Sequence, residues 1–142
     1  MRLEHIYGPN DSESKFINWL FKECLRNSPE IKLTKGEQIR DLIYIDDAIN
    51  ALYILINNIN KINYGPNQIG LGTGKGISIK KVSEIIKKET KSSSKLMFGS
   101  LKYRDNEIMK SISNNEILHK LGWVNKISFN EGIKKMVNEF EK

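Results

Sequence analysis

The segment Gly36–Asp47, with the sequence GEQIRDLIYIDD, constrains this chain more than any other stretch. It joins a glycine turn, a strand that carries one arginine, and a helix that opens with two aspartates. A guanidinium fixed in the middle of a largely apolar strand can grip a diphosphate through two parallel hydrogen bonds. We therefore expect Arg40 to face a binding cleft. The alternative is a structural ion pair with Asp41 or another nearby carboxylate.

Size and composition predict a single globular domain. A chain of 142 residues is long enough to bury a core of its own. Its contents of 39% hydrophobic and 28% charged residues exclude a disordered chain. The longest apolar run, near Ala51–Ile56, is far shorter than the ~20 residues of a membrane-spanning helix. The single cysteine excludes an internal disulfide framework, and the charged residues near the start interrupt any signal-peptide pattern. We therefore expect a cytoplasmic protein.

The basic character of the chain leaves a second class of function open. A net charge of +6 and a pI near 9.3 are compatible with a small binding module for nucleic acid or an acidic partner. The lysines, however, are spread along the chain and often alternate with glutamate, as in Lys87-Lys88-Glu89. This pattern favours a solvated surface with a mild positive field, which also suits a nucleoside diphosphate. A nucleic-acid module would lose affinity steeply with salt.

Hydrophobic periodicity predicts one mixed α/β unit without internal repeats. We expect strands at Leu3–Ile6, Ile31–Leu33, Ile39–Ile45, Asn67–Leu71 and Lys95–Phe98, the second and third on either side of a Lys35-Gly36 turn. We expect helices capped by Ser12 or Ser14, Asp46, Ser78, Asn114 or Asn115, and Ser128, where Ser128–Glu131 is a capping box. The buried stripes are expected at Phe16, Ile17, Leu20, Phe21, Cys24 and Leu25, at Ile49, Leu52, Leu55 and Ile56, and at Ile133, Met136, Val137 and Phe140.

The glycines of Gly70–Gly76 are interpreted as a structural turn. A phosphate-binding P-loop needs Gly-Lys followed by serine or threonine, but Lys75 is followed by Gly76. In a dinucleotide-binding turn the helix opens within the glycines, whereas the helix expected here begins only near Ile79.

No metal site or nucleophilic triad is expected. Asp46 and Asp47 are adjacent at a helix start, where carboxylates serve the positive end of the helix dipole. His5 and His119 are isolated from each other and from any cysteine cluster.

The segment Gly36–Asp47 resembles the G-x-x-R-D-(F/L)-(I/V)-Y-V-x-D segment of the extended short-chain dehydrogenases that act on nucleotide-sugars. These are the NAD(P)-dependent epimerases, dehydratases and reductases of carbohydrate biosynthesis. Further matches stand in the family's order: Arg2 with Tyr7-Gly8-Pro9, Gln68–Gly74 with Ser78, Arg104–Glu107, and Leu121-Gly122-Trp123. The resemblance covers nearly the whole chain. His5 and Gln68 stand where the family usually has asparagine.

The resemblance implies an α/β fold that forms the C-terminal, substrate-binding part of such an enzyme. This part has a small mixed sheet with flanking helices and lacks the N-terminal Rossmann half. The implied ligand is a nucleoside-diphosphate-sugar. Arg40 and Arg104 would hold its phosphates, Glu107 its nucleoside, and Tyr7 would lie at the edge of the site. Residues 1–142 would then be one substrate-binding domain.

The family's catalytic and cofactor motifs are missing from this sequence. There is no Gly-x-x-Gly-x-x-Gly turn, and none of the five tyrosines is followed by lysine four residues later. We therefore expect no catalytic residue, cofactor site or metal in the chain alone, with NAD or NADP bound by the parent enzyme. Expected partners are the missing Rossmann half or a homologous subunit, and exposed apolar surface would favour a homo-oligomer. A scaffold subunit that pairs with a full-length relative is a third interpretation.

Overall fold

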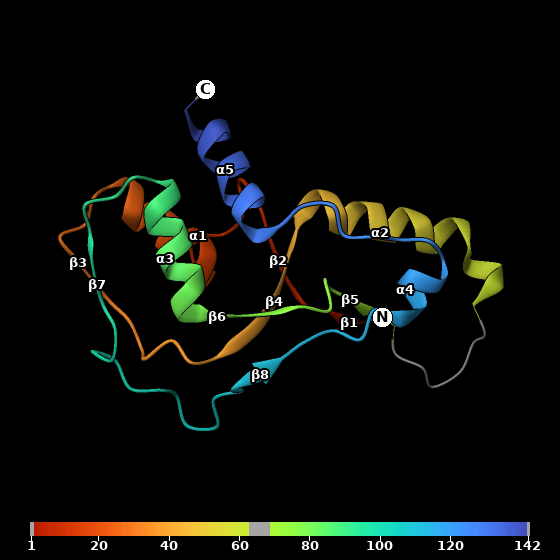
Figure 1. The fold of residues 1–142 in the computed structure, drawn as a ribbon, viewed down its shortest axis with the longest axis horizontal. Helices are drawn as coiled ribbons and strands as arrows, with labels where there is room; N and C mark the ends of the chain where they lie inside the picture. The colour runs from red at the N-terminus through yellow and green to blue at the C-terminus, as the bar shows by residue number, and fades with distance from the viewer. Residues whose placement is uncertain (1, 63–68, 142) are drawn as a thin grey trace.

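The computed structural model describes residues 2–62 and 69–141, which form a mixed α/β structure (Figure 1). Its elements in chain order are β1 (Arg2–Leu3), β2 (His5–Tyr7), α1 (Phe16–Leu25), β3 (Glu30–Lys32), β4 (Ile39–Tyr44), α2 (Ile45–Asn57), the 3-10 turn η1 (Ile59–Lys61), β5 (Gly70–Leu71), β6 (Gly76–Ser78), α3 (Ile79–Glu89), β7 (Lys95–Met97), β8 (Lys110–Ser111), α4 (Glu116–Lys120) and α5 (Phe129–Phe140). No helix among these residues is long and apolar enough to cross a bilayer.

Strand β4 organises the largest sheet. It pairs in parallel with β2 and β8 and antiparallel with β6. Two further pairs, β1 with β5 and β3 with β7, are both parallel. The expected α/β architecture, a small mixed sheet with flanking helices, is confirmed. Of the expected strand Asn67–Leu71, residues 67 and 68 lie outside the described residues, and β5 covers the end of it.

The two strands expected on either side of the Gly36 turn are present as β3 and β4, but they do not pair with each other. Strand β3 pairs with the distant β7, and β4 pairs elsewhere. The intervening residues lie against the start of α3, where the amides of Ile79 and Lys80 donate to the carbonyls of Gln38 and Gly36 at 2.9 and 2.8 Å. Gly36 has a φ of 76°, and a Cβ there would come within 2.8 Å of the Lys80 nitrogen. Glycine is therefore required by both the conformation and the close approach.

The core has two parts. One gathers α1, α3 and α5 at one end of the molecule, and the other lies beneath α2 and α4 (Figure 1). In the first part Leu20, Val82, Ile86 and Ile133 are fully buried. In the second, the Trp123 ring is buried and its indole N–H donates to the carbonyl of Asp47 at 3.3 Å.

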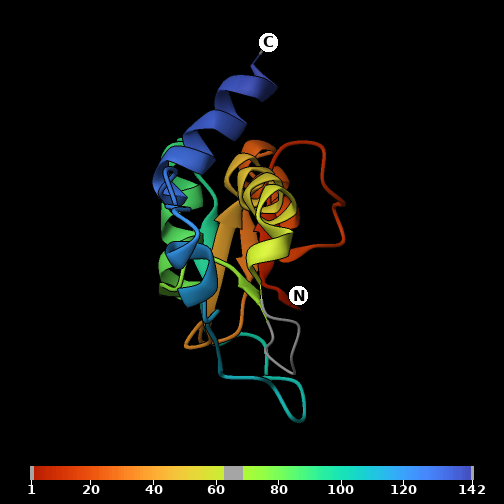
Figure 2. The same cartoon turned by 90° about the vertical axis from the view of Figure 1, so that its right-hand side faces the viewer.

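The predicted buried stripe of α2 is wrong at Ile49 and Ile56. These side chains are 58% and 68% exposed, whereas Ala48 and Ala51 are buried. Leu55 is buried and Leu52 packs against the core, as expected, but the small alanines bury little area while letting the helix approach the sheet, so counting large apolar residues missed them. Together with Tyr53, which is 66% exposed, Ile49 and Ile56 form an apolar strip at helical spacing. Phe140, also expected inside, is exposed because the last turn of α5 projects beyond the other helices (Figure 2).

Two of the expected helix caps are confirmed. The Ser128 hydroxyl accepts from the Glu131 amide, and the Glu131 carboxylate accepts in return from the Ser128 amide. Ser78 caps α3 by accepting from the amide of Lys81.

The expected side-chain caps of the three other helices are not formed as predicted. Helix α1 starts after Lys15 without a side-chain cap, because the Ser12 and Ser14 hydroxyls bond to each other at 2.7 Å. Asp46 lies within the first turn of α2, two residues after the N-cap residue Tyr44. Asn115 is the N-cap residue of α4, as expected, but its side chain makes no capping bond, whereas the Asn114 side chain accepts from the amide of Glu116 at 3.1 Å.

We predict that Gly132→Ala destabilises the fold. Alanine favours a helix over glycine by about 1 kcal/mol. Here, however, its Cβ would overlap the Tyr7 hydroxyl and come within 2.9 Å of the Tyr44 ring. Overpacking of this kind costs roughly 1–3 kcal/mol. Chemical denaturation should reveal this loss, while Asn138→Ala on an exposed turn of the same helix should change stability little. Equal or higher stability of Gly132→Ala would contradict this packing.

Candidate functional site

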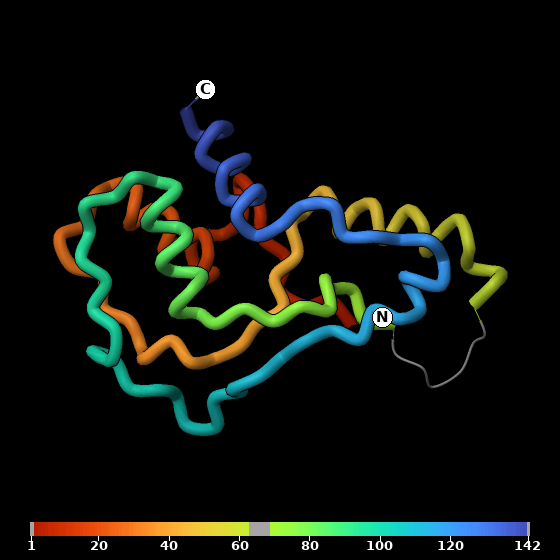
Figure 3. Tube along the Cα trace, viewed as in Figure 1, coloured from red at the N-terminus to blue at the C-terminus, as the bar shows by residue number. Residues whose placement is uncertain are grey.

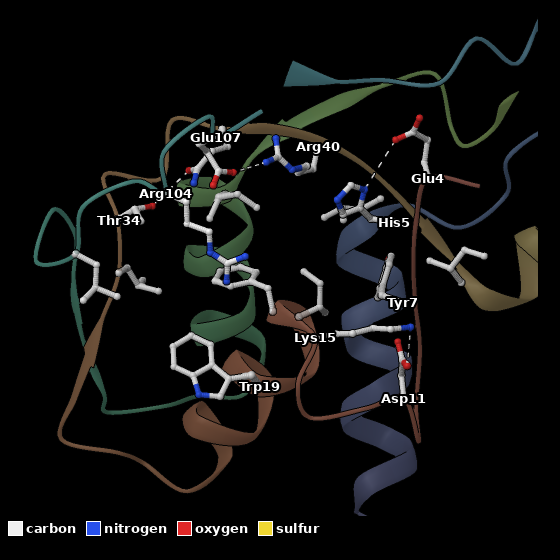
Figure 4. A pocket seen from close by; sticks show the side chains of 18 of the residues that line it. Glu4, His5, Tyr7, Asp11, Lys15, Trp19, Thr34, Arg40, Arg104 and Glu107 are labelled. Atoms are coloured by element: carbon white, nitrogen blue, oxygen red, sulfur yellow. Dashed lines mark hydrogen bonds and ion pairs between the residues drawn. The ribbon is translucent and has the colours of Figure 1, made fainter. Parts of the chain in front are cut away.

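A cavity of about 830 Å³ opens beside β2 and β4. It is bounded by the start of α1, the segment around Leu33 and Thr34, and the loop from Leu101 to Glu107 (Figure 4). The trace of this loop runs alongside the chain that leads into β4 (Figure 3). Two contacts fix it there: the amide of Leu101 donates to the carbonyl of Leu33, and the Tyr103 hydroxyl donates to the Glu37 carboxylate. The volume lies within the usual range for small-molecule sites.

Arg40 is held in this cavity by Glu107, 67 residues further along the chain. Its Nη2 lies 2.7 Å from Glu107 Oε1, and its Nη1 donates to the carbonyl of Ile39 at 3.0 Å. The two side chains are 12% and 20% exposed. The guanidinium therefore has a fixed orientation and retains donors for a ligand. A structural ion pair does exist, but with Glu107 and not with Asp41.

Arg104 enters the same cavity from the loop that precedes β8 (Figure 4). The amide of Glu107 donates to the carbonyl of Arg104 at 3.1 Å, closing a turn in which Asn106 has a φ of 62°. This turn directs Arg104 and Glu107 to one cavity. Among residues 2–62 and 69–141, no carboxylate forms an ion pair with Arg104. The roles of Arg104 and Arg40 as phosphate ligands, and of Glu107 as a nucleoside ligand, stay predictions.

Tyr7 lines the cavity with its ring but not with a free hydroxyl. The side chain is 2% exposed, and the hydroxyl lies 3.4 Å from the carbonyl oxygen of Phe129, the acceptor of its hydrogen bond. Burial, reinforced by Tyr44 and Asp47, raises the pKa of Tyr7 far above the ordinary value of a tyrosine. The predicted substrate contact at Tyr7 is untested, and the geometry favours a packing role between β2 and α5.

The sequence did not single out Asp41, yet it is the most highly connected carboxylate near the site. It is fully buried and accepts from the amides of Thr73, Gly74 and Ser113 and from the Thr73 hydroxyl, at 2.6 to 3.1 Å. Gly74 has a φ of 73°, which presents its amide to the carboxylate. The glycine-rich segment thus wraps a side chain of its own protein. The sequence feature that could have identified Asp41 is its position as an acidic residue inside a largely apolar strand.

Asp47 has a structural role comparable to that of Asp41. Its carboxylate accepts from the amides of Lys126 and Ile127 and from the Asn125 side chain. Asp46, its neighbour, points outward and pairs with Lys135 at 3.2 Å. The described residues contain no group of three or more His, Cys, Asp or Glu side chains that could hold a metal ion.

The opposite end of the cavity is apolar. Trp19 and Phe16 lie on α1 with ring centroids 6.0 Å apart, and both line the cavity together with Leu33 and Leu101. Arg40 lies at one end of this site, Trp19 at the other, and the guanidinium of Arg104 between them (Figure 4), which suits an elongated ligand with a negative part and a flat apolar part.

Comparison with known proteins matches the sequence of this chain to a family. The model of the NAD dependent epimerase/dehydratase family matches residues 1–70. A CDP-abequose synthase of Salmonella muenchen is 45% identical over 139 residues, which are 97% of this chain and 46% of that protein. The protein of the same name from Salmonella typhimurium is 40% identical over 141 residues. The chain belongs to the NAD-dependent epimerase/dehydratase family.

The solved structures agree with this assignment. The UDP-glucose 4-epimerase of Thermotoga maritima, determined with UDP-glucose, superposes with a TM-score of 0.81 at 25% identity. The match covers 99% of this chain and 44% of that one. This epimerase-family chain thus spans about half the length of the relatives it matches, and the expected family resemblance is confirmed.

We predict that Asp41→Asn destabilises this epimerase-family chain severely. An asparagine would turn an NH₂ group toward donors that all need an acceptor, leaving buried amides unpaired. The expected loss is on the order of 2–4 kcal/mol in the free energy of unfolding, measured by urea denaturation. Asp46→Asn is the matched control, because its exposed ion pair contributes at most about 1 kcal/mol. Equal effects of the two changes would refute the assigned role of Asp41.

Proposed function

We propose that this chain binds the nucleoside-diphosphate part of a nucleotide-sugar in the cavity between Arg40 and Trp19. The observation that supports this most strongly is the convergence of Arg40 and Arg104, from segments more than sixty residues apart, on one cavity. Two guanidinium groups there offer several N–H donors to a diphosphate, although Glu107 already balances one of their two positive charges. The names of the relatives, CDP-abequose synthase and UDP-glucose 4-epimerase, support the same class of ligand.

Each side chain has a distinct part in this proposal. Arg40 meets the diphosphate in a fixed orientation, because Glu107 already holds one edge of its guanidinium. Arg104 closes over the phosphates from the loop. The second carboxylate oxygen of Glu107 can accept from a ribose hydroxyl. Trp19 offers its ring face to the base, and stacking of this kind contributes roughly 1–3 kcal/mol per base.

The whole protein is proposed to change one carbon of the sugar by hydride transfer with NAD or NADP. Residues 1–142 are its substrate-binding domain, and an N-terminal Rossmann half, in the same chain or in a homologous subunit, supplies the cofactor and the acid/base tyrosine. Anchoring the nucleoside diphosphate at a distance from the sugar converts binding energy into alignment of the reacting carbon. The chain alone is expected to bind without turnover.

Titration of the purified chain with cytidine, uridine and guanosine diphosphates tests the proposal. Trp19 lines the cavity, whereas Trp123 is buried. Ligand binding in the cavity should therefore quench the fluorescence of Trp19. This quenching should be absent in the Trp19→Phe variant, which shows that it reports occupancy of this site. Saturable binding with a modest salt dependence is expected. A steep loss of affinity with salt and indifference to the nucleotide would instead indicate a nucleic-acid module. Absence of saturable binding, even with the missing half supplied, would overturn the proposal.

We predict that Arg40→Lys and Arg104→Lys each weaken nucleotide binding, although each keeps the positive charge. Lysine cannot supply the planar two-point contact of a guanidinium. The expected cost is on the order of 1.5–3 kcal/mol, or roughly ten- to a hundredfold in affinity. Melting temperatures recorded alongside separate a binding role from a structural one. A lower melting temperature with unchanged affinity would reduce Arg40 to an ion-pair partner of Glu107.

Lys22→Arg provides the matched control for these two variants. Lys22 lies on α1 outside the cavity and pairs with Glu13 at 2.9 Å at the surface. Exchange of the two basic residue types there should leave both affinity and melting temperature unchanged.

A further inference from the structure

His5 lies on the same cavity wall as Arg40 and has no part in the arrangement described so far. Strand β2 pairs with β4 so that His5 stands opposite Leu42, two residues after Arg40. Side chains two residues apart on a strand share a face. The imidazole and the guanidinium are therefore neighbours, and both line the cavity (Figure 4). The His5 side chain is 50% exposed, so a ligand in the cavity can reach it.

Among the described residues, the groups around His5 leave its charge only partly balanced. Glu4 is the nearest carboxylate, with Oε2 3.8 Å from His5 Nδ1, beyond the length of a good hydrogen bond. That carboxylate already accepts from the Ser111 hydroxyl at 2.8 Å and pairs with Arg2 at 3.4 Å. Asp41 acts on His5 from β4, but its oxygens are bonded to backbone amides. Arg40 opposes a second positive charge beside it.

We propose that His5 is a proton-dependent ligand of the nucleotide-sugar diphosphate, acting beside Arg40, so that the substrate binds more tightly when the imidazole is protonated. The inference rests on the proposed function and adds to it a residue that sets the pH dependence of binding. A phosphate oxygen between His5 and Arg40 would turn their mutual repulsion into two attractive contacts.

The sign of the pH effect follows from the charges. In the free chain, burial and then Arg40 lower the pKa of His5, against the weaker opposing effects of Glu4 and Asp41. The imidazole is therefore mostly neutral at pH 7. A bound dianion favours the protonated form and raises the pKa in the complex. Binding then takes up one proton from solvent between the two pKa values, and affinity rises as the pH falls through that window.

The test is the affinity of UDP-glucose and CDP-glucose between pH 5.5 and 8. The diphosphate of a nucleotide-sugar is a diester and carries no proton that titrates in this range, so the dependence reports the protein. We expect affinity to increase by roughly tenfold toward the acidic end, with a slope of at most one proton. His5→Asn should bind with an affinity that is nearly independent of pH.

The control uses the only other histidine of the sequence. His119 packs against Trp123 at 6.0 Å and does not line the cavity. His119→Asn should keep the pH dependence, and its single remaining histidine allows the pKa of His5 to be followed by NMR with and without ligand. A rise of that pKa on binding is the expected result.

The outcomes separate this inference from the proposed function. Affinity that depends on Arg40 but not on pH, with an unchanged His5 pKa, would overturn the role of His5 and leave the proposed function standing. Loss of the pH dependence in His119→Asn would also overturn it. Absence of any saturable binding would overturn both.

Discussion

The structure depends on one buried carboxylate. Asp41 lies inside β4 with no exposed surface and accepts hydrogen bonds from residues 32 and 72 positions away in the chain. A charged group can remain buried only when its hydrogen bonds are satisfied, so the glycine turn and the segment after β8 must both close on it. This requirement explains why a glycine-rich segment without a phosphate-binding motif occurs here: its amides serve an aspartate.

The site follows from this constraint. With the chain fixed after β8 at Ser113, the loop that precedes β8 is drawn over the cavity and delivers Glu107 to Arg40. Arg40 and Asp41 are adjacent on one strand and face opposite ways. One holds the fold together while the other faces the cavity. A change at Asp41 would therefore disturb binding only through the fold, whereas a change at Arg40 can disturb binding with the fold intact.

Sequence patterns predicted local features well and long-range ones poorly. The capping box at Ser128, the Ser78 cap and the strand that carries Arg40 are local and were found. The Arg40–Glu107 pair emerged only as two separate family matches, because the loop that joins them has no periodicity. The buried face of α2 was only partly predicted: Leu55 was found, but Ala48 and Ala51 were not, because burial there selects them for size and not for hydrophobicity. The pairing of β3 with β7 joins segments about 65 residues apart, which local propensity does not predict.

The central claim is that a nucleotide-sugar occupies the cavity with its diphosphate at Arg40. The most direct measurement is an NMR titration of the ¹⁵N-labelled chain with UDP-glucose and CDP-glucose, following the guanidinium Nε–H signals and the indole N–H signals. The account predicts saturable shifts at Arg40, Arg104 and Trp19, with the signals of Arg26 and Trp123 unchanged. Shifts confined to residues outside the cavity, or none at saturating ligand with the missing half present, would contradict it.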